Sequence, residues 1–171
     1  SELVRGKLYG NVEILLTVPG GATGLRTPNF IRTANWLTSC GKEVGNTAHL
    51  STQVGVHLEE LCEFIEQLDI HSSDHDKDDT LYALRSLADR YKSGELQAGF
   101  LDPVKALDAL CDTEVTGNGV AYIAGWNKLR ADQLVLQAND AKLVNGSPVI
   151  LEGGKIGKPE GWVPANLTDC V

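Results

Sequence analysis

Long apolar runs are missing from this 171-residue sequence. The longest stretch, Val12 to Val18, contains Glu13 and falls far short of the roughly 20 residues that a membrane-spanning helix needs. The N-terminal segment also lacks the extended apolar core of a signal peptide. We therefore expect a protein that does not enter a membrane and that works in the cytoplasm.

Basic residues are also scarce. The chain has 15 lysines and arginines against 23 aspartates and glutamates, which gives a formal net charge of -8. Proteins that bind nucleic acids use clustered positive charge to displace counterions from the phosphate backbone. With no basic stripe in the sequence, we expect no nucleic-acid partner.

The chain has few cysteines, and they are not paired in sequence. Cys40, Cys62, Cys111 and Cys170 lie far apart with no C-x-x-C pair, which argues against a disulfide framework and against a zinc site. Cys62 and Cys111 fall on helices expected to face the core, so we expect reduced, buried thiols. The length and the absence of a linker or repeat predict one domain over residues 1–171.

Periodicity and turn residues predict a mainly α-helical fold with small β elements at both ends. Glycine and Asn-Gly signals end several of the expected helices, and a polar break covers residues 70–79. Gly117, Gly119 and Gly125 are expected to interrupt the stretch after the fourth helix. The expected helices span about 28–40, 48–69, 80–93, 103–115 and 128–143, with strands or hairpins within 8–18 and 148–159.

The second expected helix carries a concentrated acidic face. Each helical residue turns about 100°, so its four glutamates fall within an arc of roughly 120°. They are Glu59, Glu60, Glu63 and Glu66. The opposite side carries Leu50, Val54, Leu58, Leu61, Ile65 and Leu68, a pattern typical of a helix packed on a core. Taken alone, the acidic face is that of an ordinary solvated helix.

The fourth expected helix changes this interpretation. Asp108 and Asp112 share a face with Val104, Leu107, Cys111 and Val115, and the one lysine of this helix, Lys105, lies on another face. A buried carboxylate costs several kcal/mol or more unless it is paired or bound to a metal. A hard divalent cation held between the two acidic helices is therefore the favoured partner.

These acids carry a family resemblance. The pattern is similar to that of the all-α nucleoside triphosphate pyrophosphohydrolases, the superfamily of MazG, the dimeric dUTPases and phosphoribosyl-ATP pyrophosphohydrolase. Their E-x-x-D helix is matched by Asp112, but Ala109 stands in the position of its first acid, and Asp108 lies one residue earlier. The E-E-x-x-E motif of the superfamily is matched by Glu59, Glu60 and Glu63.

Two further segments resemble superfamily elements that carry lysine. Asn139 and Lys142 match an N-x-x-K element near the substrate phosphates, and Lys155 and Lys158 lie in a segment like the C-terminal turn of MazG-like members. The matched segments span about residues 28–164. For all of these lysines, an ordinary surface role is the competing interpretation.

The resemblance implies a helical bundle that hydrolyses (deoxy)nucleoside triphosphates to monophosphate and pyrophosphate and so cleans the nucleotide pool. Magnesium, with manganese as an alternative, would be held by Glu59, Glu60, Glu63, Asp108 and Asp112. Either Glu60 or Glu63 would accept the proton of the attacking water. Phosphate contacts would come from Asn139, Lys142, Lys155 and Lys158. Superfamily members form homodimers or homotetramers, so we expect an oligomer.

Several alternatives stay open. Phe30 and Trp36 could stack on the base, although core packing is the stronger expectation for both. His57 is expected to be a core or interface residue, and the polar segment around His71 to be a solvated loop. Phosphoribosyl-ATP or dUTP could be the substrate instead. A different class of function, a non-catalytic helical protein whose acidic face binds a basic partner, also fits.

Overall fold

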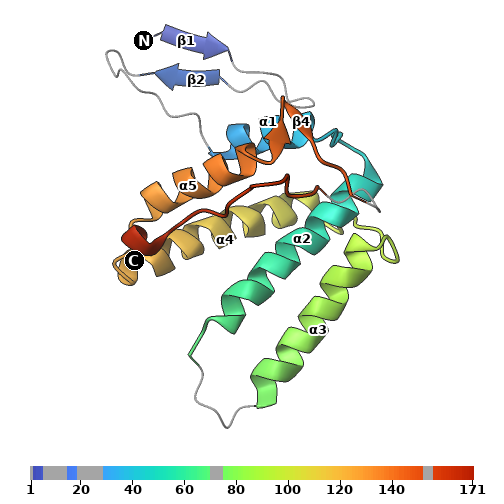
Figure 1. Cartoon of the computed structure of the whole chain (residues 1–171). Coiled ribbons are helices and arrows are strands. Elements are labelled where there is room, and N and C mark those ends of the chain that lie inside the picture. Colours follow the sequence, from blue (N-terminus) through green and yellow to red (C-terminus); the bar gives the residue numbers. More distant parts are fainter. Residues whose placement is uncertain (1, 6–14, 19–28, 70–74, 152–155) are drawn as a thin grey trace. The chain divides into compact units, whose positions relative to one another are not determined.

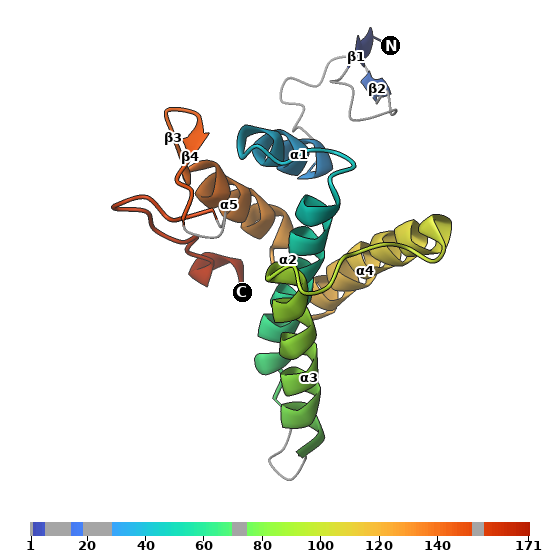
Figure 2. The same cartoon turned by 90° about the vertical axis from the view of Figure 1, so that its right-hand side faces the viewer.

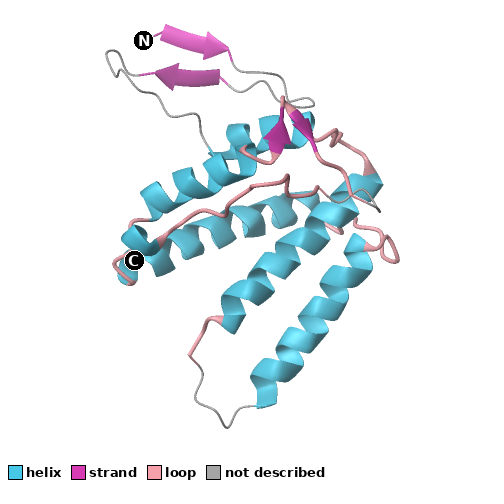
Figure 3. Cartoon of the chain, viewed as in Figure 1, coloured by secondary structure: helices cyan, strands magenta, loops and turns pink. Residues whose placement is uncertain are grey.

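Helices account for most of the described chain (Figure 3), which confirms the mainly α-helical prediction. The computed structural model describes residues 2–5, 15–18, 29–69, 75–151 and 156–171. Its five α-helices are α1 Asn29–Ser39, α2 Thr47–Glu66, α3 His75–Lys92, α4 Pro103–Ile123 and α5 Lys128–Asp140. The chain divides into two compact units, Gly45–Ala106 and the remainder. Whether the chain is one domain stays a prediction.

In the first unit, α2 and α3 lie side by side, joined at one end (Figures 1 and 2). Helix α2 begins after Asn46, whose side chain accepts a 3.1 Å hydrogen bond from the His49 amide. At the other end of α2, the Lys77 ammonium of α3 donates to the carbonyls of Glu66 and Leu68 at 3.0 and 2.7 Å. A cation at a helix C-terminus offsets the exposed carbonyls there.

Small residues form the contact between these two helices. Ser51, Gly55 and Cys62 are buried on α2, and Leu81 and Ala88 are buried on α3. The aliphatic stripe predicted to face the core is mostly half-buried, and Leu68 is exposed. That part of the prediction is wrong for the described chain. The reason is that α3 packs on the small-residue side of α2, where the backbones can approach closely.

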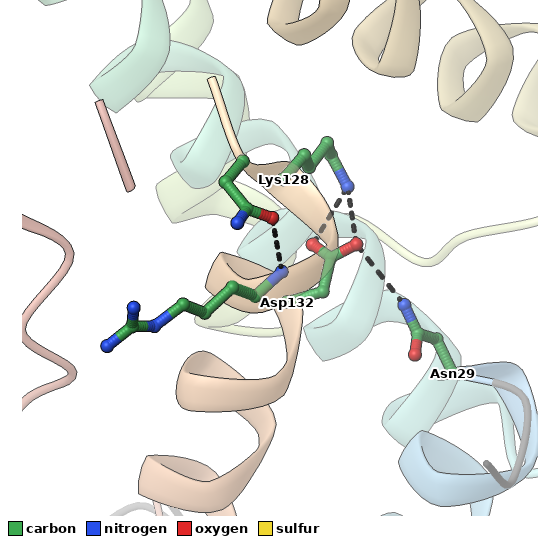
Figure 4. Close-up of polar contacts among 5 residues, drawn as sticks. Asn29, Lys128 and Asp132 are labelled. Carbon is green, nitrogen blue, oxygen red and sulfur yellow. Dashed lines mark hydrogen bonds and ion pairs between the residues drawn. The ribbon is translucent and has the colours of Figure 1, made fainter. Parts of the chain in front are cut away.

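In the second unit, α5 packs against α1 through polar contacts. Arg32 of α1 donates to Asp140 of α5 at 2.7 Å, and within α5 Asp132 accepts from Lys128 at 2.8 Å. Figure 4 shows Asn29 reaching the same Asp132 carboxylate, with a 3.5 Å separation between the Asn29 amide nitrogen and the carboxylate oxygen. These contacts anchor α1 near both ends of α5.

The C-terminal segment returns to α5. The Trp162 indole N–H donates to the carbonyl of Ala138 at 2.7 Å. The amide of Asn127, which precedes α5, donates to the carbonyl of Cys170 at 2.8 Å, within the short 3-10 helix Thr168–Cys170. The C-terminal segment is therefore held at two points, at Ala138 within α5 and at Asn127 just before it.

Two short antiparallel pairs confirm that β elements occur near both ends of the chain. Strand β1 (Glu2–Arg5) pairs with β2 (Leu15–Val18). Strand β3 (Leu143–Val144) pairs with β4 (Ser147–Pro148) across Asn145-Gly146, which both have positive φ as a two-residue hairpin turn requires. An isolated bridge between Ile150 and Ile156 follows.

The largest differences from the predicted helix boundaries are at the start of α3 and the end of α4. Helix α3 begins at His75, inside the segment predicted as a polar break, because Asp76 and Asp78 suit the first turn of a helix. Helix α4 continues through both of its glycines to Ile123. A glycine costs only about 1 kcal/mol relative to alanine inside a helix, so two of them weaken α4 without ending it.

Candidate functional site

The acidic face of α2 and the facing side of α3 line a cavity of about 350 Å³. Its walls carry four carboxylates and two cationic side chains, all within the first unit. They are Glu59, Glu63, Glu66 and Asp89, with Arg85 and Lys92. Three of the four predicted acidic-face glutamates therefore share one cavity, whereas Glu60 is not among its lining residues.

Two of these glutamates are neutralised by cations from α3. The Lys92 ammonium lies 2.8 Å from a Glu59 carboxylate oxygen and 3.0 Å from an Asp89 carboxylate oxygen. Arg85 pairs with Glu66. Partial burial alone would lower the pKa of Lys92, but the hydrogen bonds and charges of Glu59 and Asp89 outweigh it and raise that pKa above 10.5. Lys92 is therefore firmly cationic.

Glu63 differs from its neighbours. It lines the cavity and is exposed, and among the described residues its side chain makes no hydrogen bond or ion pair. Glu60 is also exposed and has an interaction partner. Glu63 is therefore the carboxylate of the cavity that is free to accept a ligand.

Whether this cavity holds magnesium stays a prediction. Within the described part of the chain, no three His, Cys, Asp or Glu side chains lie close enough to hold a metal together. Magnesium, however, typically keeps several waters and takes only one or two carboxylates from the protein. In the structure, the cation that pairs with Glu59 is the Lys92 ammonium.

The aspartates of α4 lie in the second unit and are exposed. Their side chains make no hydrogen bond or ion pair with any described residue. The apolar neighbours predicted to bury them are exposed as well, at 78% for Val104, 63% for Leu107 and 66% for Val115. The expectation that Asp108 and Asp112 sit in a core is wrong for the described chain, because a stripe is buried only where another element covers it.

Two other burial predictions fail on the same helices. Cys111 is exposed, whereas Cys40, Cys62 and Cys170 are buried, and all four are free thiols. The prediction of a buried Cys111 is wrong, and the prediction of reduced thiols stays a prediction. His57 is exposed, so a core role is wrong for it. The apolar stripe of α4 and the His57 side of α2 are exposed for the same reason, because no described residue packs over them.

The predicted phosphate-binding residues meet two tryptophans in the second unit. Lys142 donates to the side-chain oxygen of Asn139 at 2.9 Å, and its ammonium lies 5.9 Å from the Trp36 ring centroid and 5.2 Å from that of Trp162. Lys158 lies 4.9 Å from the same Trp162 ring. These are cation–π distances.

The tryptophan rings are held in place by backbone acceptors. The Trp36 indole N–H donates to the carbonyl of Asn139 at 2.8 Å, and the ring is half-buried, as core packing predicts. Phe30, the other candidate for base stacking, is 66% exposed. Lys155 lies outside the described residues. The cluster of Trp36, Asn139, Lys142, Lys158 and Trp162 is called the lysine–tryptophan cluster below.

Sequence reasoning missed the contribution of α3 to the cavity. Lys92 lies 33 positions from Glu59, and a single sequence carries no signal that joins residues so far apart. Gly55 in the middle of α2 was the available hint, because a glycine inside a helix often marks a close backbone approach. Trp162 was missed for the same reason as Lys92.

No protein-family model, curated protein or solved structure matches this chain. No described helix has both the length and the apolar character needed to cross a membrane. The functional assignment therefore rests on the residues themselves.

Proposed function

We propose that this chain is a metal-dependent nucleoside triphosphate pyrophosphohydrolase of the all-α superfamily, acting in the cytoplasm on the nucleotide pool. The observation that carries the proposal is the cavity in which Glu59 and Glu63 of the E-E-x-x-E segment lie together with the cations Arg85 and Lys92. Carboxylates are the ligands that suit a hard metal ion. The helical content supports the fold part of the proposal.

Glu63 is the leading metal ligand in this proposal, because it faces the cavity without a partner among the described residues. Glu59 would become a second metal ligand once the Lys92 ammonium no longer pairs with it. Glu60, which is exposed, remains with Glu63 a candidate to accept the proton of the attacking water. The family resemblance assigns Asp108 and Asp112 to metal binding, and each is testable by its own variant.

Magnesium or manganese, when bound, would orient the phosphates, lower the pKa of a water molecule and offset the charge of the triphosphate. The residues of the chain have complementary tasks. The net acidic protein would repel a triphosphate, so its cations must be placed where the phosphates bind. Asn139, Lys142 and Lys158 are proposed for this role, with Trp36 holding Lys142 in position.

A homodimer or homotetramer is part of this proposal. Large apolar side chains are exposed along α4, among them Val104, Leu107, Val115, Tyr122 and Ile123. Exposed apolar patches of this kind mark interaction surfaces on soluble domains. Their presence on the helix that carries Asp108 and Asp112 favours assembly through α4.

Pyrophosphate release from a panel of ribo- and deoxyribonucleoside triphosphates tests the reaction, with and without magnesium. We expect magnesium-dependent release by the native chain, lost in Glu63→Ala and in Asp112→Ala. Glu95→Ala is the matched control, since Glu95 pairs with Arg90 outside the cavity.

Three results would contradict the proposal in different ways. Release that persists in both variants would refute the site. Release of orthophosphate in place of pyrophosphate would refute cleavage of the triphosphate to a monophosphate and pyrophosphate. No release from any triphosphate would overturn the proposed substrate class and would move the assay to phosphoribosyl-ATP.

A further inference from the structure

The ring of Trp162 contacts two lysines that come from different parts of the chain. The ammonium nitrogen of Lys142, two residues after the end of α5, lies 5.2 Å from the ring centroid, and that of Lys158 in the C-terminal segment lies 4.9 Å from it. Both distances fall within the range of about 6 Å for a cation–π contact. Lys142 also faces Trp36, so Trp162 is the ring common to both lysines.

The Trp162 ring is itself fixed by hydrogen bonds at two places. Its indole N–H donates to the carbonyl of Ala138 in α5 at 2.7 Å. Its backbone amide donates to the carbonyl of Pro159 at 3.0 Å, which closes a turn through Gly161, whose φ is 77°. The side chain is half-buried. The two flexible lysines are therefore ordered on a ring whose position does not depend on them.

The convergence of two ammonium groups on one ring is unfavourable by itself. Their nitrogen atoms can be no farther apart than the sum of their distances to the ring centroid, so each lies in the electric field of the other. Among the described residues, the Trp162 ring is the partner that the structure shows for the Lys158 ammonium. A ligand with several negative charges would stabilise both lysines at once.

We propose that Trp162 is a positioning residue, whose ring holds Lys142 and Lys158 together so that they bind the successive phosphates of a polyphosphate chain. The inference rests on the phosphate contacts proposed above for these lysines and adds the residue that brings them together. The ring attracts the charge of an ammonium without accepting its hydrogen bonds, so Lys158 can donate to a phosphate oxygen while it stays over the ring. Two ammonium groups favour a chain of phosphates over a single phosphate.

The test is isothermal titration calorimetry of the purified full chain with inorganic tripolyphosphate and with orthophosphate, without divalent metal. We expect the native chain to bind tripolyphosphate more tightly than orthophosphate. Trp162→Ala should weaken tripolyphosphate binding by about three- to ten-fold, because the ligand would then have to order Lys158 itself. Trp162→Phe should bind like the native chain, because it keeps a ring and loses only the hydrogen bond to Ala138.

Two further variants complete the test. Trp126→Ala is the matched control, because this tryptophan is 46% exposed and takes part in none of the cation–π contacts of the described residues. It should leave both affinities unchanged. Lys158→Met decides the question if Trp162→Ala does not fold, since Lys158 is exposed and its loss leaves the hydrogen bond of Trp162 to Ala138 in place. It should weaken the binding of tripolyphosphate more than that of orthophosphate.

The outcomes separate this inference from the proposed reaction. Equal weakening in Trp162→Ala and Trp162→Phe would show that the hydrogen bond matters in place of the ring, and would overturn the inference. Equal affinity of the native chain for tripolyphosphate and orthophosphate would overturn it too. No binding of tripolyphosphate by the native chain would refute the proposed phosphate contacts as well. Binding that depends on the Trp162 ring, in a chain that releases no pyrophosphate, would support the inference and refute only the reaction.

Discussion

Gly55 of α2 lies directly against the backbone of Ala88 in α3. A Cβ placed on Gly55 would lie 2.6 Å from the Ala88 carbonyl oxygen and 2.9 Å from the Lys92 amide nitrogen. Both neighbours are backbone atoms, which cannot move without separating the helices. The closest contact of the α2–α3 unit therefore depends on the absence of a side chain at one position.

We expect Gly55→Ala to destabilise the chain by about 1–3 kcal/mol, as overpacking of a tight contact does. Gly117→Ala in α4 is the matched control, because nothing lies within 4 Å of a Cβ at Gly117. The control should gain about 0.5–1 kcal/mol from helix propensity. Urea unfolding of both variants measures the difference. Equal and favourable effects of the two substitutions would show that α2 and α3 are not in close contact.

The Gly55 contact also shows why the sequence predicted where the helices lie better than it predicted which side of each helix is buried. Helical periodicity and glycine stops located five helices, since both signals are local. Which side of α2 is buried depends on α3, and the aliphatic stripe was the wrong choice because Gly55 and Ser51 admit a closer neighbour. The acidic face was recognised from spacing, but its partners Arg85 and Lys92 lie 19 and 33 positions from the glutamates that they pair with, and no local pattern joins them.

Cys111 should be the fast-reacting thiol of the chain. It is exposed, whereas the three other cysteines are buried, and burial raises the pKa of the Cys40 thiol despite the nearby charges of Lys42 and Lys142. Only the thiolate reacts, so Cys40 is protected by both access and protonation. Titration with Ellman's reagent at about pH 8 should give one rapid equivalent. Cys111→Ser should remove it, and Cys40→Ser should leave it unchanged. A rapid phase that survives in Cys111→Ser would contradict the burial of the others.

The stability that Lys92 contributes should depend on pH in the alkaline range. Its pKa is raised in the folded chain above 10.5, so its favourable pairing is fully present below that value and is lost as the pH rises through the higher folded pKa. The free energy of unfolding should therefore differ most between the native chain and Lys92→Met at about pH 8, and this difference should narrow as the pH rises above 10.5. Urea unfolding of both proteins at several pH values measures the gap. Because the other titrating groups are shared, a constant gap would show that the ion pairs of Lys92 contribute nothing.

Magnesium should raise the thermal stability of the native chain. A ligand that binds only the folded state at 100 times its Kd stabilises it by about 2.7 kcal/mol. For a chain of this length, that corresponds to a rise of about 5–10 °C in Tm. Glu63→Ala should abolish the rise, and Glu95→Ala should keep it. Differential scanning calorimetry with magnesium and with sodium chloride of equal ionic strength separates binding from screening. A rise that persists in Glu63→Ala would remove Glu63 from the site.

Lys142 combines a structural contact with a proposed role in phosphate binding, and the two can be separated. Its ammonium faces the rings of Trp36 and Trp162 and donates to Asn139, so Lys142→Met should lose about 1 kcal/mol of stability from these contacts. If the ammonium also binds substrate phosphates, KM should rise well beyond what this destabilisation causes at a temperature where the variant is folded. Trp162→Phe is the comparison, because it keeps an aromatic face for Lys142 and loses only the hydrogen bond to Ala138. It should lower the Tm with little change in KM. Equal KM values for Lys142→Met and Trp162→Phe would show that the lysine–tryptophan cluster only holds the C-terminal segment to α5 and does not bind phosphates.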